Sequence, residues 1–115
     1  MITTTGPDGE SRNTLVAYSV GTLLSESREA NAIAGMLLHL QITCNEKGHV
    51  TFQSIEYTPT YIWKQTTSGR TAYRVIASHQ SPPSEMDQNQ REVMSRALQR
   101  VQETLANSPV YMRNW

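Results

Sequence analysis

The stretch Gly35-Met36-Leu37-Leu38-His39-Leu40-Gln41-Ile42, followed by the polar run Asn45-Glu46-Lys47-Gly48, decides the fold of this 115-residue chain. Every second residue from Met36 to Ile42 is apolar, and the residues between them are mixed. A period of two is typical of a β-strand with one apolar face. The polar run has the composition of a loop that closes with glycine in the left-handed region. The pattern therefore predicts an antiparallel β-hairpin.

The returning strand, His49 to Tyr57, changes the parity of its apolar residues partway along. A β-bulge near Gln53 or Ser54 would restore one apolar face, because one extra residue moves every later side chain to the opposite face. Pro59 cannot donate to a ladder, so we expect the strand to be interrupted there or to lie at an edge.

A second hairpin follows. Residues Tyr61–Lys64 resume β character, a turn is expected at Thr66–Gly69, and Ala72–Ala77 return from it. Upstream, Thr14–Val20 is short, β-branched and aromatic, so it predicts a central strand. The segment Gly6–Gly9 has turn chemistry and could belong to a hairpin loop or a frayed tail.

A C-terminal helix is predicted after the prolines Pro82 and Pro83. Ser84 is a suitable N-cap, and Asn107-Ser108-Pro109 ends the helical pattern. Apolar residues at helical spacing form one stripe, which we expect to cover the sheet face that holds Met36, Leu38, Leu40 and Ile42. The stripe comprises Met86, Val93, Met94, Ala97, Leu98, Val101 and Leu105.

The predicted fold is α+β: a small antiparallel β-meander of three to five strands with one long C-terminal helix packed on it. We expect a single module spanning residues 1–115. It divides into a flexible or loop segment (1–13), the meander (14–78), the helix (84–106) and a tail (107–115).

Composition narrows the function classes. Ten basic and ten acidic residues cancel, so there is no basic field to attract nucleic acid. No apolar run approaches the roughly 20 residues that a membrane-spanning helix needs. The single cysteine, Cys44, cannot form an intramolecular disulfide. We therefore expect neither a nucleic-acid partner nor a membrane segment.

Residues suited to chemistry are sparse. His39 lies on the mixed face of its strand, but no other His, Asp or Cys stands near it at metal-ligand spacing. Trp63 belongs to an aromatic group that could stack on a ligand, although cross-strand pairing is the more common use of such residues. We therefore name no catalytic residue and no metal ligand, and we keep His39 and Trp63 as candidates for facing a ligand.

Three segments in order resemble a known family. Tyr18-Ser19-Val20-Gly21-Thr22-Leu23, the run from Gly35, and Tyr57-Thr58-Pro59-Thr60 resemble the C-terminal end of bacterial poly-γ-glutamate capsule synthesis proteins of the CapA type. We write the family pattern as Y-S-L-G-N-F, a variable loop, a glycine with a hydrophobic run, and Y-x-P-T-W. The positions that match its short motifs are Tyr18, Ser19, Gly21, Thr22, Pro59 and Thr60, and at Thr22 the family favours asparagine.

The resemblance implies a function at the cell surface. The family is similar to calcineurin-like metallophosphoesterases, whose metal-binding motifs, including a His-Pro-His segment, lie upstream of Y-S-L-G-N-F. This chain contains none of these motifs. The resemblance therefore implies a C-terminal fragment of a capsule biosynthesis protein that is noncatalytic alone, with a divalent metal expected only in a full-length relative.

A second hypothesis belongs to another class. The chain could be a stand-alone noncatalytic interaction module that pairs sheet edges with itself or with a partner. We expect either a homo-oligomer or association with the missing N-terminal part of the parent fold. The expected contact is the strand Leu15–Val20, with Tyr57, Tyr61 and Trp63 lining the same exposed face.

Overall fold

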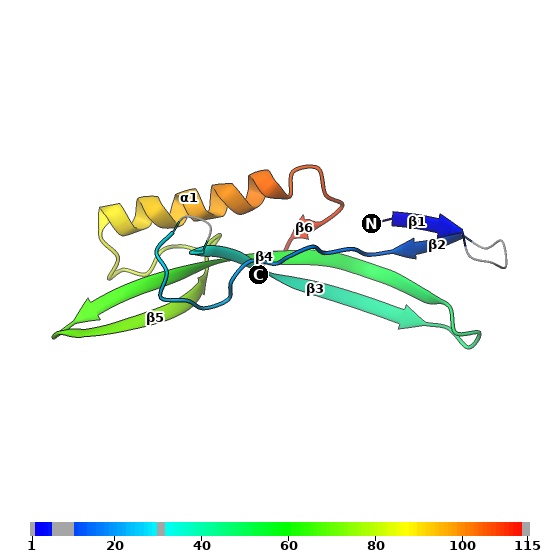
Figure 1. The fold of residues 1–115 in the computed structure, drawn as a ribbon, viewed down its shortest axis with the longest axis horizontal. Coiled ribbons are helices and arrows are strands. Elements are labelled where there is room, and N and C mark those ends of the chain that lie inside the picture. Colours follow the sequence, from blue (N-terminus) through cyan, green and yellow to red (C-terminus); the bar gives the residue numbers. More distant parts are fainter. Residues whose placement is uncertain (1, 6–10, 30–31, 114–115) are drawn as a thin grey trace.

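The computed structural model describes residues 2–5, 11–29 and 32–113. Its elements are β1 (Ile2–Thr5), β2 (Ser11–Thr14), β3 (Ala34–Cys44), β4 (Val50–Thr67), β5 (Arg70–Ala77), α1 (Gln88–Thr104) and β6 (Tyr111–Met112). Strands β3, β4 and β5 form an antiparallel meander, β6 pairs in parallel with β4, and β1 and β2 form a separate hairpin. The predicted α+β fold, a meander with one helix, is confirmed (Figure 1).

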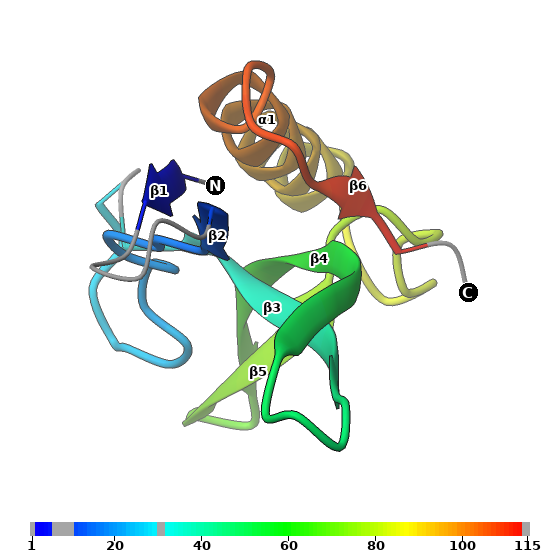
Figure 2. The same cartoon turned by 90° about the vertical axis from the view of Figure 1, so that its right-hand side faces the viewer.

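The molecule is elongated. Its principal extents are 63 × 24 × 22 Å and its radius of gyration is 18.0 Å, against about 13 Å for a compact domain of this size. The sheet arches, with α1 on its convex side and the tips of both hairpins pointing away from the helix (Figures 1 and 2). Much of the sheet therefore projects beyond the helix.

The predicted β-bulge is present. Gln41 pairs with Ser54, but the next residue of β3, Ile42, pairs with Phe52, so that Gln53 is the extra residue. Cross-strand partners in an antiparallel pair share a face. The bulge therefore brings the apolar residues on both sides of Gln53 to one face of β4.

Both hairpin turns use positive φ angles, which the composition predicted for the first of them. In the loop between β3 and β4, Gly48 has φ +80°. The turn between β4 and β5 has only two residues, Ser68 and Gly69, with φ angles of 52° and 76°. Two positive φ angles in a two-residue loop define a type I′ turn, whose twist matches that of the flanking strands.

The strand is not interrupted at Pro59, because β4 is one continuous strand. On the side away from β3, however, neither β5 nor β6 pairs with Pro59, so the residue lies at a local edge, which was the other alternative. The carbonyl of Pro59 accepts a hydrogen bond from the amide of Ser78, just beyond the end of β5. A strand residue points its N and its O to the same side. The missing N–H of Pro59 therefore faces the gap between β6, which pairs at Glu56 and Tyr57, and β5, which pairs from Thr60.

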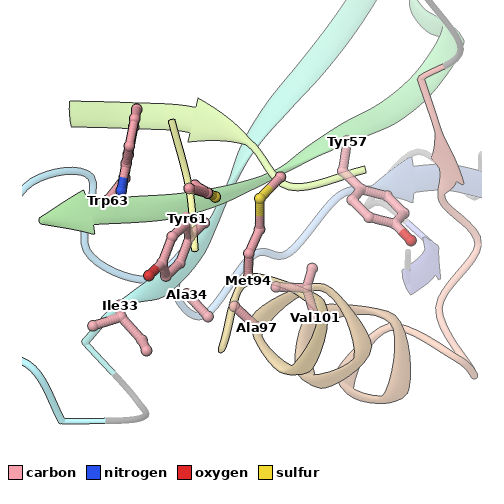
Figure 3. Close-up of a cluster of buried hydrophobic side chains, with 9 residues drawn as sticks. Ile33, Ala34, Tyr57, Tyr61, Trp63, Met94, Ala97 and Val101 are labelled. Atoms are coloured by element: carbon pink, nitrogen blue, oxygen red, sulfur yellow. The ribbon is translucent and has the colours of Figure 1, made fainter. Parts of the chain in front are cut away.

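The core lies between the middle of β4 and the helix. Tyr57, Tyr61 and Trp63 of β4 are only 6%, 2% and 3% exposed. They pack in one cluster with three helix residues of the predicted stripe, Met94, Ala97 and Val101 (Figure 3). The helix covers the sheet only in part, because Leu40 and Ile42 of β3 remain 41% and 52% exposed. The expectation that it would bury them was wrong.

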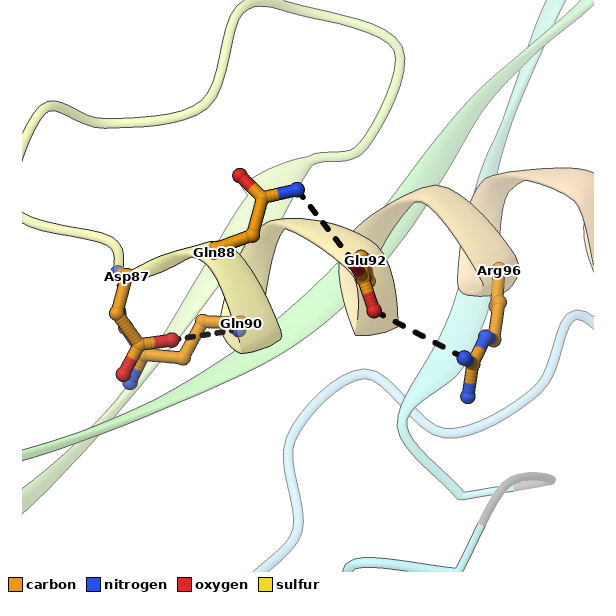
Figure 4. Close-up of polar contacts among 5 residues, drawn as sticks. All are labelled: Asp87, Gln88, Gln90, Glu92 and Arg96. Carbon is orange, nitrogen blue, oxygen red and sulfur yellow. Dashed lines mark hydrogen bonds and ion pairs between the residues drawn. The ribbon is translucent and has the colours of Figure 1, made fainter.

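The helix begins later than predicted, at Gln88 instead of Ser84. Asp87 is the N-cap: its carboxylate accepts a bond from the Gln90 amide at 2.7 Å, and the Gln90 side chain accepts one from the Asp87 amide at 3.1 Å (Figure 4). This reciprocal capping box satisfies two backbone donors at once. A serine at position 84 would satisfy only one such donor, and the helix therefore has Asp87 as its N-cap instead of Ser84.

The N-terminal region differs most from its prediction. Residues 15–20 form no strand, and Tyr18 is 95% exposed. Residues 1–13 were expected as a flexible or loop segment, but Ile2–Thr5 pair with Ser11–Thr14 as β1 and β2. The turn predicted at Gly6–Gly9 lies outside the described residues. The expected tail also contains a strand, because the two residues of β6 pair with β4.

Candidate functional site

The three motif segments meet at one place, which we call the glycine junction: Gly21, Gly35 and Thr60. Gly21 forms an isolated antiparallel bridge with Gly35, and Gly35 pairs across the sheet with Thr60. Beside the bridge, the amide of Met36 donates to the carbonyl of Val20 at 2.9 Å. Three segments that are far apart in the sequence thus lie side by side, each paired through its backbone with the next.

The junction leaves little room for a side chain at its two glycines. A Cβ atom on Gly35 would lie 3.0 Å from the carbonyl oxygen of Thr22 and 3.1 Å from the Thr60 hydroxyl oxygen. A Cβ atom on Gly21 would lie 3.0 Å from the Cα of Gly35, and Gly21 has φ +81°. Real Cβ atoms are seldom this close to other atoms, and other residues adopt such a φ only at a cost. Close packing therefore favours glycine at both positions, and at Gly21 the positive φ favours it as well.

The other residues of the first motif serve the turn. The hydroxyl of Ser19 accepts a hydrogen bond from the Gly21 amide at 3.2 Å, which is a local side-chain to backbone turn. Tyr18 and Thr22 have exposed side chains. The structure therefore brings the backbone of this motif to the sheet and leaves the Tyr18 and Thr22 side chains in solvent.

The residues of the second motif are buried. Pro59 is among the residues less than 2% exposed, and Thr60 is 3% exposed. The hydroxyl of Thr60 lies under Gly35, as the Cβ distance shows. Pro59 and Thr60 thus belong to the interior of the sheet and do not form a surface that a ligand could reach.

A shallow groove lies between the junction and the end of the helix. One cavity of about 270 Å³ is lined by residues 19–21 and 34–36 together with Arg100, Val101, Thr104 and Leu105. A second, of about 260 Å³, shares Ser19, Met36, Thr104 and Leu105 with the first and continues along residues 15–18. Among the described lining residues there is no carboxylate, histidine or cysteine, and the titratable side chains are Arg100 and Tyr18, so the groove offers a mainly apolar surface.

His39 lies on the opposite face of β3 from Met36 and Leu38, which line the groove. Its Nε2 is 2.7 Å from the hydroxyl oxygen of Thr58 and its Nδ1 is 3.2 Å from a guanidinium nitrogen of Arg113. A guanidinium only donates hydrogen bonds, so Nδ1 accepts and the ring proton is on Nε2. His39 therefore ties the residue that follows β6 to β3 and β4, and it does not point into the groove.

Trp63 does not form a platform for a ligand. Its side chain is 3% exposed and packs in the core. Its indole Nε1 is buried, and among the described residues it has no hydrogen-bond partner. Trp63 therefore does not face a ligand on the surface, because its side chain is buried in the core cluster.

Sequence reasoning missed Arg28. This residue donates from one guanidinium nitrogen to the carbonyl of Ile62 at 2.9 Å and from the other to the Tyr61 hydroxyl at 3.4 Å. It fastens the loop after the glycine junction to the centre of β4. A lone arginine in a polar loop carries no pattern that distinguishes it from a solvated one.

Within residues 2–5, 11–29 and 32–113, no three His, Cys, Asp or Glu side chains gather as a metal site would require. No helix in the same part of the chain combines the length and hydrophobicity needed to cross a membrane. Comparison with family models, curated proteins and solved structures gave no match to this chain.

Proposed function

We propose that this chain is the C-terminal part of a capsule biosynthesis protein of the poly-γ-glutamate type and that it acts there as a noncatalytic structural unit. The observation that carries the proposal is the glycine junction. The family pattern joins three segments by order alone, and in the fold the same three segments are in backbone contact. A chance match of short motifs would not require their glycines and threonine to touch.

The junction also indicates what the unit contributes. Close backbone packing favours glycine at Gly21 and Gly35, and the buried Thr60 lies against Gly35. The motifs in this part of the chain therefore support architecture. In the proposal, metal binding and catalysis belong to the upstream motifs of a full-length relative, and the present unit completes the sheet beside them at the cell surface.

Disruption of the gene in the source organism tests the proposal. We expect the amount of glutamate polymer on the cell surface, measured after acid hydrolysis, to fall. The intact gene and a Gly48→Asn variant should restore it, because nothing lies within 4 Å of a Cβ atom at Gly48. A Gly35→Val variant should not restore it. An unchanged polymer level after disruption would overturn the proposal.

A second test concerns the isolated chain. We expect calorimetric titration with manganese or zinc to show no stoichiometric site of micromolar affinity, because catalysis is assigned to motifs that this sequence lacks. A tight site that disappears in a His39→Ala variant would contradict the noncatalytic role.

A further inference from the structure

Strand β3 is an edge strand that is covered only at its beginning. Within the described residues, β4 pairs with it along one side. On its other side the bridge from Gly21 reaches Gly35, and the Met36 amide donates to Val20. Beyond Met36, no strand of the described part of the chain lies beside β3 on that side, up to Cys44.

The Met36 bond shows which backbone groups point outward. Because β3 itself is regular and the bulge lies in β4, alternate residues continue the direction of Met36. The N–H and C=O groups of Leu38, Leu40, Ile42 and Cys44 therefore point away from β4. They form a row of donors and acceptors of the kind that templates pairing with another strand.

The two edges of the sheet differ in charge. Strand β3, eleven residues long, contains no charged residue and no proline. Strand β5 forms the other edge and carries Arg70 and Arg74. If β5 paired with its own copy about Ala72, these arginines would lie opposite each other, and like charges in that position are destabilising. Charged side chains commonly protect exposed edges, and β3 lacks this protection.

We propose that the outer edge of β3 pairs antiparallel with β3 of a second copy of this chain, with the two-fold axis at Gln41. In this register Leu38 lies opposite Cys44 of the second copy, and Leu40 lies opposite its Ile42. All four outward residues then fall in hydrogen-bonded pairs, and each pair exchanges two backbone bonds.

The self-complementarity of the strand selects a second copy as the occupant. Apolar residues meet apolar residues on one face, and His39 meets Thr43 of the second copy on the other, so that no like charges are opposed. The pairing places the exposed apolar side chains of the β3–β4 hairpins of the two copies side by side on one continuous sheet. In each copy Leu40, Ile42 and Val50 are 41%, 52% and 59% exposed. The dimer proposal is argued from the edge of β3 alone and does not use the proposed capsule function, so either proposal can fail without the other.

Cysteine cross-linking tests the register. In a Cys44→Ser background, Gln41→Cys places two cysteines at the two-fold axis as a non-hydrogen-bonded pair, whose Cα atoms are about 4.5 Å apart. This distance suits a disulfide. A Thr43→Cys variant is the matched control, because four residues separate it from its own copy along the strand, about 14 Å.

The expected result is a covalent dimer as the main species for Gln41→Cys under mild oxidation, and little for Thr43→Cys. Equal cross-linking of the two variants would overturn the register. Light scattering of the full chain across a dilution series should give a mass of twice 12.9 kDa. A mass of 12.9 kDa at every concentration would overturn the dimer itself.

A proline variant tests the edge. Leu40→Pro removes an N–H that points away from β4, so it should leave the β3–β4 ladder intact and raise the dimer dissociation constant at least tenfold. Val50→Lys is its control, since it changes the same apolar face on β4 without touching the edge, and it should remain dimeric. Circular dichroism confirms that both variants fold, and a Leu40→Pro variant that dimerises like the wild type would contradict the proposal.

Discussion

The two halves of β4 both carry apolar side chains at alternate positions, but one half is buried and the other is exposed. From Tyr57 to Trp63 every residue of the strand is buried, and Tyr57, Tyr61 and Trp63 pack in one cluster with residues of α1, whereas from Val50 to Gln53 the strand is largely exposed in a hairpin that projects from the body. Both halves have apolar side chains on the face toward the helix. Alternation therefore tells which face of a strand is apolar, and it does not tell whether anything covers that face.

The lengths of the elements explain the difference. A helix of 17 residues is about 25 Å long at 1.5 Å per residue. A strand of 18 residues extends about 60 Å at 3.3 Å per residue. One helix of this length cannot cover the whole strand, so some apolar surface must remain bare or be covered by another chain.

The largest expected difference between the halves is in side-chain truncation. Met94→Ala removes a side chain that is 2% exposed against the covered half of β4, and it should lower the free energy of unfolding by about 2–5 kcal/mol. The control is Ile42→Ala in the bare half. If the two variants lose equal stability in urea titrations, the helix does not define the core.

Hydrogen exchange should separate the two halves directly. The amides of Leu37 and Thr43 both point toward β4, but Leu37 pairs with Thr58 in the covered half and Thr43 with Thr51 in the bare half. Hairpins without a packed face open at low cost. If the two opening free energies differ by about 3 kcal/mol, the Leu37 amide should exchange about 100-fold more slowly, since every 1.4 kcal/mol is a factor of ten. Equal rates would mean that the whole hairpin opens as one unit.

The glycine junction should be sensitive to one methyl group. Gly35→Ala places a Cβ atom 3.0–3.3 Å from three oxygen atoms, and overpacking of this kind costs about 1–3 kcal/mol. Gly48→Asn in the bare hairpin is the control, because asparagine tolerates a positive φ and the site is open. Thermal unfolding of both variants decides the point, and an unaffected Gly35→Ala melting temperature would show that the junction is loose.

The smallest effect expected is that of the helix cap. Asp87→Ala removes the acceptor for the Gln90 amide and should cost about 1 kcal/mol. Ser84→Ala should change the stability by less than about 0.5 kcal/mol, since surface substitutions away from such features are nearly neutral. If denaturant titrations show a larger loss of stability for Ser84→Ala than for Asp87→Ala, Ser84 is the N-cap after all.

Much of the sheet was predictable from local chemistry. The loop that ends at Gly48, the turn at Ser68 and Gly69, and the bulge at Gln53 each follow from the spacing of a few neighbouring residues. The capping box at Asp87 and Gln90 was also visible in the sequence, but Ser84 competed with it as an N-cap. Such features involve contacts within a few residues, so they need no knowledge of the rest of the chain.

The sequence by itself determined the meander, the apolar stripe of the helix and the order of the motif segments. Only the tertiary structure decided that Leu15–Val20 forms no strand, that Trp63 is covered, and that Gly21, Gly35 and Thr60 touch. The physical reason is that periodicity reports the preference of a segment for an interface, whereas burial depends on which other segment reaches that interface. Here the length of one short helix divides the long strand β4 into a buried half and an exposed half.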